Sequence, residues 1–528
     1  MRNNARLVAL CYALFSSTLF LTGCTKVGPD FHRPEPVVAR EWLEAEDPKV
    51  KSEPVEYRDW WQAFSDPVLD RLIDLAYREN LPLRIAGLRV LEARAQLGIA
   101  VGELYPQSQQ AFGFLEYNRI SPGASQSVSN PSQKFWQSEI GLSASWEIDF
   151  WGKFRRAIES DHAGWLASVA DYDSALVSLT ADVASSYIFL RTIEKRIDIA
   201  RRNAEIQKES LRIAEARFKY GSVSELDVEQ AKTVLNSSLA SIPALETQLQ
   251  QTKNVLSIQL GMAPNPLANL LAEAAGIPAP PSQVAVGIPA QLLRRRPDIR
   301  AAEYRAEAQC ALIGVAKAEL YPAISLTGVF GFVSSDAGGS HLSDMFQWKS
   351  RTILAGPVVR WNILNYGQIT NNVRVQDARF QQLLVGFQSI VLQAQQEVED
   401  ALIAFLKAQD RAEYLARSAE AAKRSLEIAI LQYQQGTKDF TTVLSAQQAL
   451  LNEQDSLATT LGDISRNLVG VYRALGGGWQ IREGEELVPQ GVLEAMAKRT
   501  NWGNLLAPAV YMPPAAESSE SGLRPPDW

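Results

Sequence analysis

The chain repeats itself at an offset of about 215 residues, and this duplication limits the possible folds more than any other feature of the sequence. The tetrapeptide Glu-Leu-Tyr-Pro begins at Glu103 and again at Glu319, and Trp-Glu-Ile at Trp146 corresponds to Trp-Asn-Ile at Trp361. Matches that keep one offset over much of a chain indicate that a structural unit occurs twice. We therefore expect two copies of one unit.

The repeat divides the chain into six segments. A proline-rich connector separates the two copies, and the flanking pieces are rich in Pro and Gly, which favours irregular segments packed on the outside. The expected segments are a signal peptide (1–23), an N-terminal anchor and outer segment (24–64), the first copy (65–261), the connector (262–289), the second copy (290–476) and a C-terminal outer segment (477–528).

Each copy contains a long stretch without proline. Residues 367–475 of the second copy and 152–242 of the first have none. Within them, apolar residues recur at alternating spacings of four and three, from Phe380 to Tyr433 and from Trp165 to Phe218. A sustained period of 3.5 residues predicts long helices that supercoil to the left around their neighbours.

Both long helices are expected to end at a glycine, Gly221 in the first copy and Gly436 in the second. The apolar period resumes after each glycine. A glycine at a helix C-terminus followed by a new helix predicts a helical hairpin. Because the two hairpins are copies, both tips should lie at the same end of the particle.

Before each long helix the apolar period drops to two. The expected strands cover about 107–118 and 138–149 in the first copy, and 323–333 and 353–364 in the second. Alternating strands of about ten residues flanked by aromatic residues are typical of a membrane barrel wall, and the alternative is two soluble hairpins on a small sheet. Since a barrel needs about eight strands, four would have to be pooled with further copies of the chain.

The N-terminus has the three regions of an export signal. Arg2 and Arg6 precede an apolar run from Leu7 to Phe20, which is shorter than a membrane-spanning helix. The run closes with Leu-Thr-Gly-Cys24, which resembles a bacterial lipobox and predicts lipidation of Cys24. The alternative is a plain signal peptide with an incidental cysteine. After cleavage, Cys310 would be the only free thiol.

Composition argues against several functions. The chain has 52 Lys and Arg against 59 Asp and Glu, a net charge of −7, so nucleic acid is an unfavourable partner. Its three His and three Cys are scattered singly, which predicts no metal site and no Cys-His nucleophile. The sequence has neither a GxxxxGK[ST] phosphate loop nor a GxSxG elbow. We expect no enzyme activity and no cofactor besides the lipid on Cys24.

Several long motifs together resemble the outer membrane factor family, the TolC-like channels, and in particular its lipoprotein branch of the OprM/NodT type. They stand in the family's order and cover nearly all of the mature chain. These motifs are the two Glu-Leu-Tyr-Pro segments and residues 24–34, 60–67, 292–299 and 361–367. The resemblance implies an α+β membrane protein, a homotrimer whose twelve-stranded outer-membrane β-barrel continues into a twelve-helix periplasmic α-barrel.

The resemblance also implies a function. It predicts a lipid-anchored outer-membrane exit duct that passively conducts drugs or other small molecules from a tripartite efflux system. The implied partners are a periplasmic adaptor and an inner-membrane transporter, most often of the resistance-nodulation-division class. The alternatives are an envelope hydrolase, which needs a nucleophile or metal cluster, and a periplasmic coiled-coil adaptor or structural lipoprotein, in which the hairpin would occur once.

The lumen of such a duct should be polar. Four glutamines between seam positions, Gln381, Gln388, Gln395 and Gln396, suit a lumen lining, and the alternative is a solvated outer helix face.

The hairpin tips are the expected gate, and here the sequence departs from its relatives. The turn of the second copy carries Thr442 and Ser445 where some relatives carry Asp, whereas the first copy keeps Glu225 and Asp227. We hypothesise that Asp227 from three chains supplies a negative field, with the hydroxyls completing a constriction. The alternative is that Asp227 supports the first turn of its helix. The expected tip residues are Gly221, Glu225, Asp227, Tyr433, Gly436, Lys438, Thr442 and Ser445.

Overall fold

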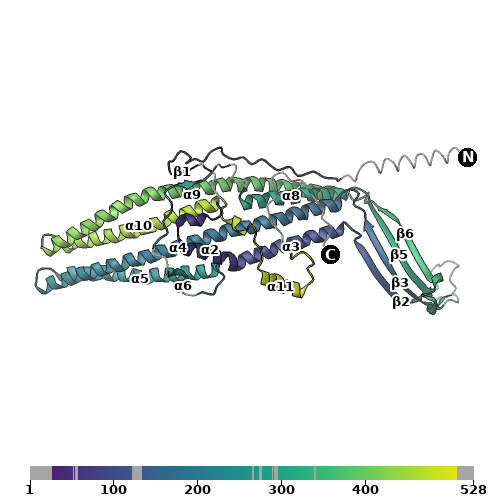
Figure 1. The fold of residues 1–528 in the computed structure, drawn as a ribbon, viewed down its shortest axis with the longest axis horizontal. Coiled ribbons are helices and arrows are strands. Elements are labelled where there is room, and N and C mark those ends of the chain that lie inside the picture. The colour runs from purple at the N-terminus through teal and green to yellow at the C-terminus, as the bar shows by residue number, and fades with distance from the viewer. Residues whose placement is uncertain are drawn as a thin grey trace.

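The computed structural model describes residues 26–507 except 52, 54–56, 122–133, 265–266, 273–275, 288, 290–294 and 338–340. The predicted signal peptide, Cys24 and residues 508–528 lie outside the described residues. The molecule is elongated, with a sheet at one end and two helical hairpin tips at the other (Figure 1). Both tips therefore lie at the same end, as the repeat predicted.

The two copies contribute equivalent elements in the same order. In the first copy these are α2 (Pro67–Glu79), α3 (Leu81–Glu103), β2 (Ser108–Arg119), β3 (Lys134–Glu147), α4 (Lys153–Lys219) and α5 (Glu225–Gln259). In the second they are α8 (Pro297–Ala318), β5 (Ala323–Ser335), β6 (Arg351–Arg360), α9 (Gln368–Gln434) and α10 (Phe440–Ala474). Short elements complete the described part of the chain: β1 (Val50–Lys51), η1 (Trp60–Phe64), α6 (Ala268–Leu271), β4 (Val284–Ala285), η3 (Leu342–Asp344), η4 (Trp348–Ser350), η5 (Trp479–Arg482) and α11 (Gln490–Arg499).

The four long strands form one antiparallel sheet in the order β2-β3-β5-β6. Directly paired residues share a face of a sheet. Leu142, Phe330 and Ile353 pair across β3, β5 and β6, so they lie on one apolar face. Glu139 lies on the opposite face, where it pairs with Phe114 of β2. The outer strands β2 and β6 each leave one edge unpaired within this sheet.

The strand bounds differ from the expected ones at several ends. Strand β3 begins at Lys134 instead of 138, because it pairs with β2 as far as Arg119. Strand β6 ends at Arg360 instead of 364, because its partner β5 begins opposite at Ala323. Pairing with a neighbour sets a strand's length, and the alternation of one strand does not show where its neighbour ends.

The helices continue the order of the strands. The chain passes from α3 into β2, from β3 into α4, from α8 into β5 and from β6 into α9. Near the sheet, α3, α4, α8 and α9 pack side by side in that order. Toward the tips, the order is α5, α4, α10 and α9. The molecule is thus a layer about four elements wide along its length (Figure 1).

Helices α4 and α9 contain 67 residues each, which corresponds to a length of about 100 Å. The predicted seam is buried along most of both helices, for example at Leu176 and Ala204 of α4 and at Val398 and Leu426 of α9. The last seam residue of α4, Phe218, is exposed instead. By length and composition α4 has one window that would suit a membrane span, but 67% of that window is buried inside the protein, as in a core helix.

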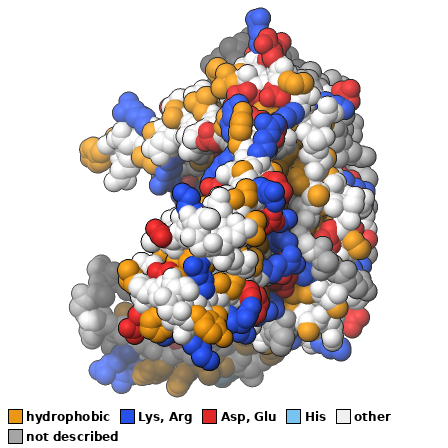
Figure 2. Space-filling view, turned by 90° about the vertical axis from the view of Figure 1, so that its left-hand side faces the viewer, with side chains coloured by type: hydrophobic (Ala, Val, Ile, Leu, Met, Phe, Trp, Pro, Cys, Tyr) orange, Lys and Arg blue, Asp and Glu red, His pale blue; other side chains and the backbone are white. Residues whose placement is uncertain are grey.

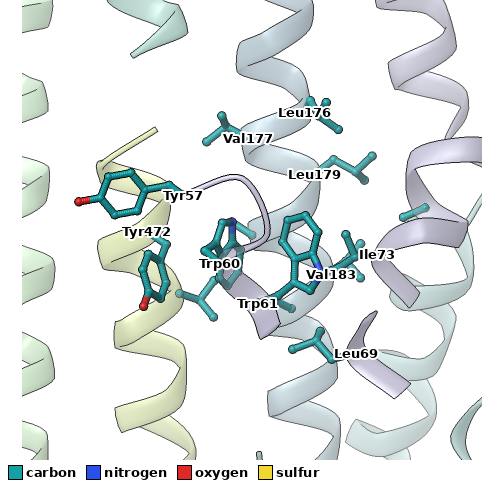
Figure 3. Close-up of a cluster of buried hydrophobic side chains, with 14 of the residues drawn as sticks. Tyr57, Trp60, Trp61, Leu69, Ile73, Leu176, Val177, Leu179, Val183 and Tyr472 are labelled. Atoms are coloured by element: carbon teal, nitrogen blue, oxygen red, sulfur yellow. The ribbon is translucent and has the colours of Figure 1, made fainter. Parts of the chain in front are cut away.

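A large aromatic core lies at mid-height. Trp60 of η1 stacks on Tyr472 of α10 with ring centroids 5.2 Å apart, and Trp61 contacts Trp60 edge-on at 5.7 Å. Figure 3 shows these rings between α10 and the apolar face of α4 that carries Leu176 and Val183. Burial of several large rings is the main apolar contribution at this height. The segment before α2 therefore forms part of the core.

The same region encloses a buried charge cluster. Asp173 of α4 is 1% exposed and accepts hydrogen bonds from Arg482, and Arg300 of α8 lies 2.7 Å from the same carboxylate. Both guanidinium groups also lie over the ring of Trp479, at 4.5 and 5.6 Å from its centroid. A buried carboxylate requires such partners, because an unpaired charge in the interior is costly.

The N-terminal stretch runs along the helices on the side of α9. Gln395 accepts a hydrogen bond from the Ala39 amide at 2.9 Å and donates one to the Val37 carbonyl at 3.2 Å. One turn further, Glu399 accepts from the Leu43 amide at 2.9 Å. The interpretation of Gln395 as a residue of a lumen lining is therefore wrong, because another segment of the chain covers its carboxamide.

Candidate functional site

The two hairpin turns have the same backbone design. Gly221 and Gly436 adopt φ angles of 67° and 74°, the left-handed conformation that favours glycine. The amide of Ser222 donates to the Arg217 carbonyl at 2.9 Å, and the amide of Thr437 donates to the Gln432 carbonyl at 3.0 Å. Both bonds close the end of a helix as in a Schellman motif. The duplicated glycines thus produce two equivalent tips.

Asp227 links the two hairpins. Its carboxylate accepts a hydrogen bond from the Tyr433 hydroxyl at 3.3 Å, across from α5 of the first hairpin to α9 of the second. Ser224, at the start of α5, lies 3.5 Å from the same carboxylate. Asp227 therefore does more than support the first turn of its own helix, which was the alternative interpretation. We name this contact and its neighbours the tip latch.

Arg217 is the second part of the tip latch. It lies in the last turn of α4, and its guanidinium donates a hydrogen bond to the Tyr433 carbonyl. The same group lies 4.6 Å from the centroid of the Tyr433 ring, a cation–π distance. Since Tyr433 contacts both Arg217 and Asp227, the first hairpin holds it through two oppositely charged side chains.

The surroundings of Tyr433 keep its hydroxyl neutral. The side chain is 3% exposed, and its ring meets Phe440 of α10 edge-on at 5.3 Å. Burial, followed by the negative charge of Asp227, raises the pKa of Tyr433 to about 12. A neutral hydroxyl can donate to a carboxylate, so the contact with Asp227 persists over the whole physiological pH range.

The remaining predicted tip residues lie apart from the tip latch. Glu225, Lys438, Thr442 and Ser445 are exposed. The Ser445 hydroxyl donates to the Thr441 carbonyl of its own helix at 2.9 Å. Within one chain, the structure thus brings Asp227 and Tyr433 together but leaves the two hydroxyls on the outer surface of the tip.

Sequence reasoning missed Arg217 and Phe440. Arg217 reads as an ordinary basic residue in the last turn of a helix, a position that favours cations. Its contact with Tyr433 joins residues 216 positions apart, from different copies of the repeat. One signal is available: Arg217 and Tyr433 stand just before the two tip glycines, and equivalent tips at one end of the molecule bring such positions close together.

The geometry serves opening and closing rather than bond chemistry. Among the described residues, no group of three or more His, Cys, Asp or Glu is placed to hold a metal ion. What the tip offers is a reversible polar contact between two long hairpins. Seen from the tip end, the outline of the molecule is concave on one side (Figure 2).

These parts define a class of protein. A sheet with an apolar face, continuous with helices about 100 Å long that end in a latched tip, is the architecture of a channel subunit that crosses an outer membrane and reaches into the periplasm.

Comparison with known proteins gives the family. The profile of the outer membrane efflux protein family matches residues 72–262 and 288–477, one range for each copy of the repeat. The chain belongs to this family. The pyoverdine export outer membrane protein OpmQ of Pseudomonas putida is 31% identical over 80% of this chain and 88% of its own length. The probable outer membrane lipoprotein SilC of Salmonella typhimurium is 30% identical over 88% and 98%.

A solved structure agrees. The outer-membrane channel OprN is 32% identical, with a TM-score of 0.79 over 86% of this chain and 99% of its own. The protein is therefore an outer-membrane efflux channel with a large helical periplasmic part. The predicted family and location are confirmed, and the alternative of a periplasmic adaptor is wrong, because the relatives are outer-membrane channels.

Proposed function

We propose that three copies of this chain assemble edge to edge into a twelve-stranded outer-membrane barrel that continues into a twelve-helix periplasmic tunnel. The observation that carries this proposal is the layer of four strands with two unpaired edges. A sheet that spans a lipid bilayer must close, because unpaired backbone groups there are costly. Two copies would give eight strands, the smallest barrel, whose interior side chains fill. Three copies leave a lumen.

Exposed apolar residues on the two edges support this assembly. Helix α3 exposes Leu81, Ile85 and Ile99 on one edge of the layer, and on the other edge α9 exposes Val385, Leu392, Tyr414 and other large side chains. Two apolar edges on opposite sides of one subunit suit a head-to-tail ring. The charges of the sheet, such as Glu139, would then line the lumen, and the apolar face would contact lipid.

The assembled tunnel would serve as the passive exit duct of a tripartite efflux system. Its partners would be a periplasmic adaptor and an inner-membrane transporter of the resistance-nodulation-division class, which supplies the energy. No catalytic step is assigned to the duct itself. The family to which the chain belongs, and the export or efflux named for its relatives, support this role.

We also propose that Cys24 carries the lipid anchor. The described chain begins at Lys26, and the Val27 amide donates to the Trp151 carbonyl at 3.0 Å, at the point where β3 leads into α4. Gly28 packs so closely on Gly314 of α8 that a Cβ on Gly28 would lie 2.4 Å from the Gly314 Cα. Cys24 lies three residues before Val27, so lipid on it would be within reach of the membrane end of the helices.

The tip latch would act as the gate of this duct. With the latch made, Tyr433 is held to the first hairpin, and the three tips converge on a narrow mouth. Three Asp227 carboxylates around that mouth would attract cations, and Thr442 and Ser445, exposed on the same tip, would narrow it further. Loss of one hydrogen bond per chain shifts such an equilibrium by about 1 kcal/mol, or about fivefold.

Assembly is tested with the full-length chain in outer-membrane fractions. We expect heat-resistant trimers on denaturing gels, and incorporation of labelled palmitate that Cys24→Ser abolishes while trimers persist, because acyl chains add membrane affinity to a barrel that inserts independently. Monomers or dimers in this fraction would overturn the trimer. Palmitate incorporation into the Cys24→Ser variant would overturn the anchor.

The gate is tested in planar lipid bilayers. Asp227→Asn should raise the open-state current and lower cation selectivity and divalent block. Glu225→Gln is the matched control, because it removes the same charge two residues away from an exposed side chain. Equal behaviour of the two variants would remove Asp227 from the gate and leave only a general field of the tip.

A further inference from the structure

A stripe of polar contacts joins the first hairpin to the second. It consists of residues of α4 spaced seven apart, each in contact with α10 or with the end of α9. The contacts are Asp182–Arg473 at 3.1 Å, the Phe189 ring with Arg466 at 5.2 Å, Arg196–Asp455 at 2.7 and 3.0 Å, Asn203–Gln454 at 2.9 Å, Ser210–Gln447 at 2.7 Å, and Arg217–Tyr433 in the tip latch. We name this set the polar stripe.

The middle of the polar stripe is buried and uncharged. Asn203, Ser210 and Gln447 are each less than 5% exposed. Buried amide and hydroxyl groups require hydrogen-bond partners, so these contacts favour one alignment of α4 against α10. Apolar seams tolerate small shifts because dispersion contacts have no fixed direction, whereas this seam has discrete positions.

One residue of this seam has no partner. The positions between neighbouring contacts on the same face of α4 are Ala200, Gln207 and Ala214. Gln207 is 2% exposed, and neither its Oε1 nor its Nε2 has a hydrogen-bond partner. Because this burial exists within a single chain, a neighbouring subunit cannot reach the carboxamide. Two alanines show that the space between contacts does not call for a polar side chain.

We propose that Gln207 is a positioning residue of the open gate, which accepts Gln447 when α10 moves away from the tip by one helical turn. Gln207 lies three residues before Ser210, the present partner of Gln447, and one turn is about 5.4 Å. Helix α4 runs toward the tip and α10 runs away from it (Figure 1). The same movement would carry Gln454 from Asn203 to Ala200.

This movement would break the tip latch. Tyr433 packs on Phe440, the first residue of α10, so it moves with the second hairpin. A displacement of one turn exceeds the range of the hydrogen bond from Tyr433 to Asp227. The closed position thus makes the latch and leaves Gln207 unpaired, and the open position pairs Gln207 and releases the latch. This inference rests on the proposed gate, and one-turn shifts between packed elements are known switching devices.

The position of α10 can be read by cysteine cross-linking of full-length trimers in membranes. Asn203→Cys with Gln454→Cys reports the present alignment, and Ala200→Cys with Gln454→Cys reports the shifted one, while Gln207 and Gln447 stay intact. We expect the first pair to cross-link in the otherwise unchanged protein. The second pair should cross-link when Asp227→Asn releases the latch. Cys310, the one cysteine among the described residues, is buried away from this seam.

Gln207→Leu then tests the residue itself. It replaces an unpaired buried carboxamide by an apolar side chain of similar size, so trimers should be at least as stable. In the Asp227→Asn background it should reduce the cross-link at 200 and 454 about fivefold, the effect of one hydrogen bond on an equilibrium.

The outcomes separate the two proposals. An unchanged cross-link at 200 and 454 in the Gln207→Leu variant, or no cross-link there in any background, would overturn the role of Gln207. Failure of Asp227→Asn to change the current would overturn the gate instead, whatever the cross-links show.

Discussion

Helices α4 and α9 are equivalent by the repeat and have the same length, yet they are buried to different degrees. Of 67 residues in each, 29 are buried in α4 and 13 in α9. Helix α4 lies inside the layer and contacts neighbours on both sides, whereas α9 forms an edge. One sequence unit therefore serves at two places with opposite demands on its outer face.

The difference is visible at equivalent positions 215 residues apart. Val177 and Ile199 of α4 are 7% and 9% exposed, and their counterparts on α9, Leu392 and Tyr414, are 58% and 70% exposed. Both helices keep apolar residues at these places. In α4 a neighbour within the chain covers them, and in α9 the covering surface belongs to another molecule. Exposed apolar patches on a subunit mark the surface at which it assembles.

The largest effect should come from charges at one such pair. Val177→Asp places a carboxylate in the filled interior, which should cost at least about 3 kcal/mol and reduce the folded protein. Leu392→Asp should leave the chain folded and reduce trimers. Protease resistance of the monomeric fraction separates loss of folding from loss of assembly. Equal loss of protease resistance in both variants would contradict the distinction between centre and edge.

A smaller effect is expected at the tip glycines. Gly221→Ala and Gly436→Ala should each cost about 1 kcal/mol, because both positions have positive φ. An added Cβ at Gly436 would lie 3.3 Å from the Arg217 guanidinium, whereas at Gly221 it would meet nothing within 4 Å. Only Gly436→Ala should therefore also change the closed-state current in bilayers. The same current change in both variants would mean that the turn alone, without Arg217, controls the tip.

The smallest effect should come from an exposed ion pair between α4 and α5. Arg201 and Glu246 are 2.7 Å apart, with side chains 62% and 48% exposed. Such pairs contribute little, because water and salt screen them, so Arg201→Ala should change the thermal stability of the trimer by less than about 0.5 kcal/mol. A loss above about 1 kcal/mol would show that this surface is covered in the assembly.

The sequence allowed prediction of the elements that depend on local period. The heptad seam of α9 from Phe387 to Tyr433 is buried where the spacing of four and three placed it, and the strand pairs stand in front of the long helices. These features depend on residues a few positions apart, so one chain segment contains the whole signal.

Contacts between the copies were beyond that reasoning. The polar stripe on α4 has the spacing of a solvated helix face, and only the neighbouring helix distinguishes a buried Asn203 from an exposed one. Gln395 was open to two interpretations for the same reason, since the segment that covers it lies 356 residues earlier in the chain. Periodicity shows which face of a helix differs from the rest, but not what lies against it.

The buried carboxylate of Asp173 has a consequence for biogenesis. Its two guanidinium partners come from α8 and from η5, and the latter, Arg482, follows 309 residues later in the chain. While the polypeptide is being exported, Asp173 leaves the translocation machinery long before Arg482 does. The mid-height core can therefore close only after nearly the whole chain has been delivered. Contacts of such sequence separation form slowly, so the exported chain requires protection from aggregation until its C-terminal segment arrives.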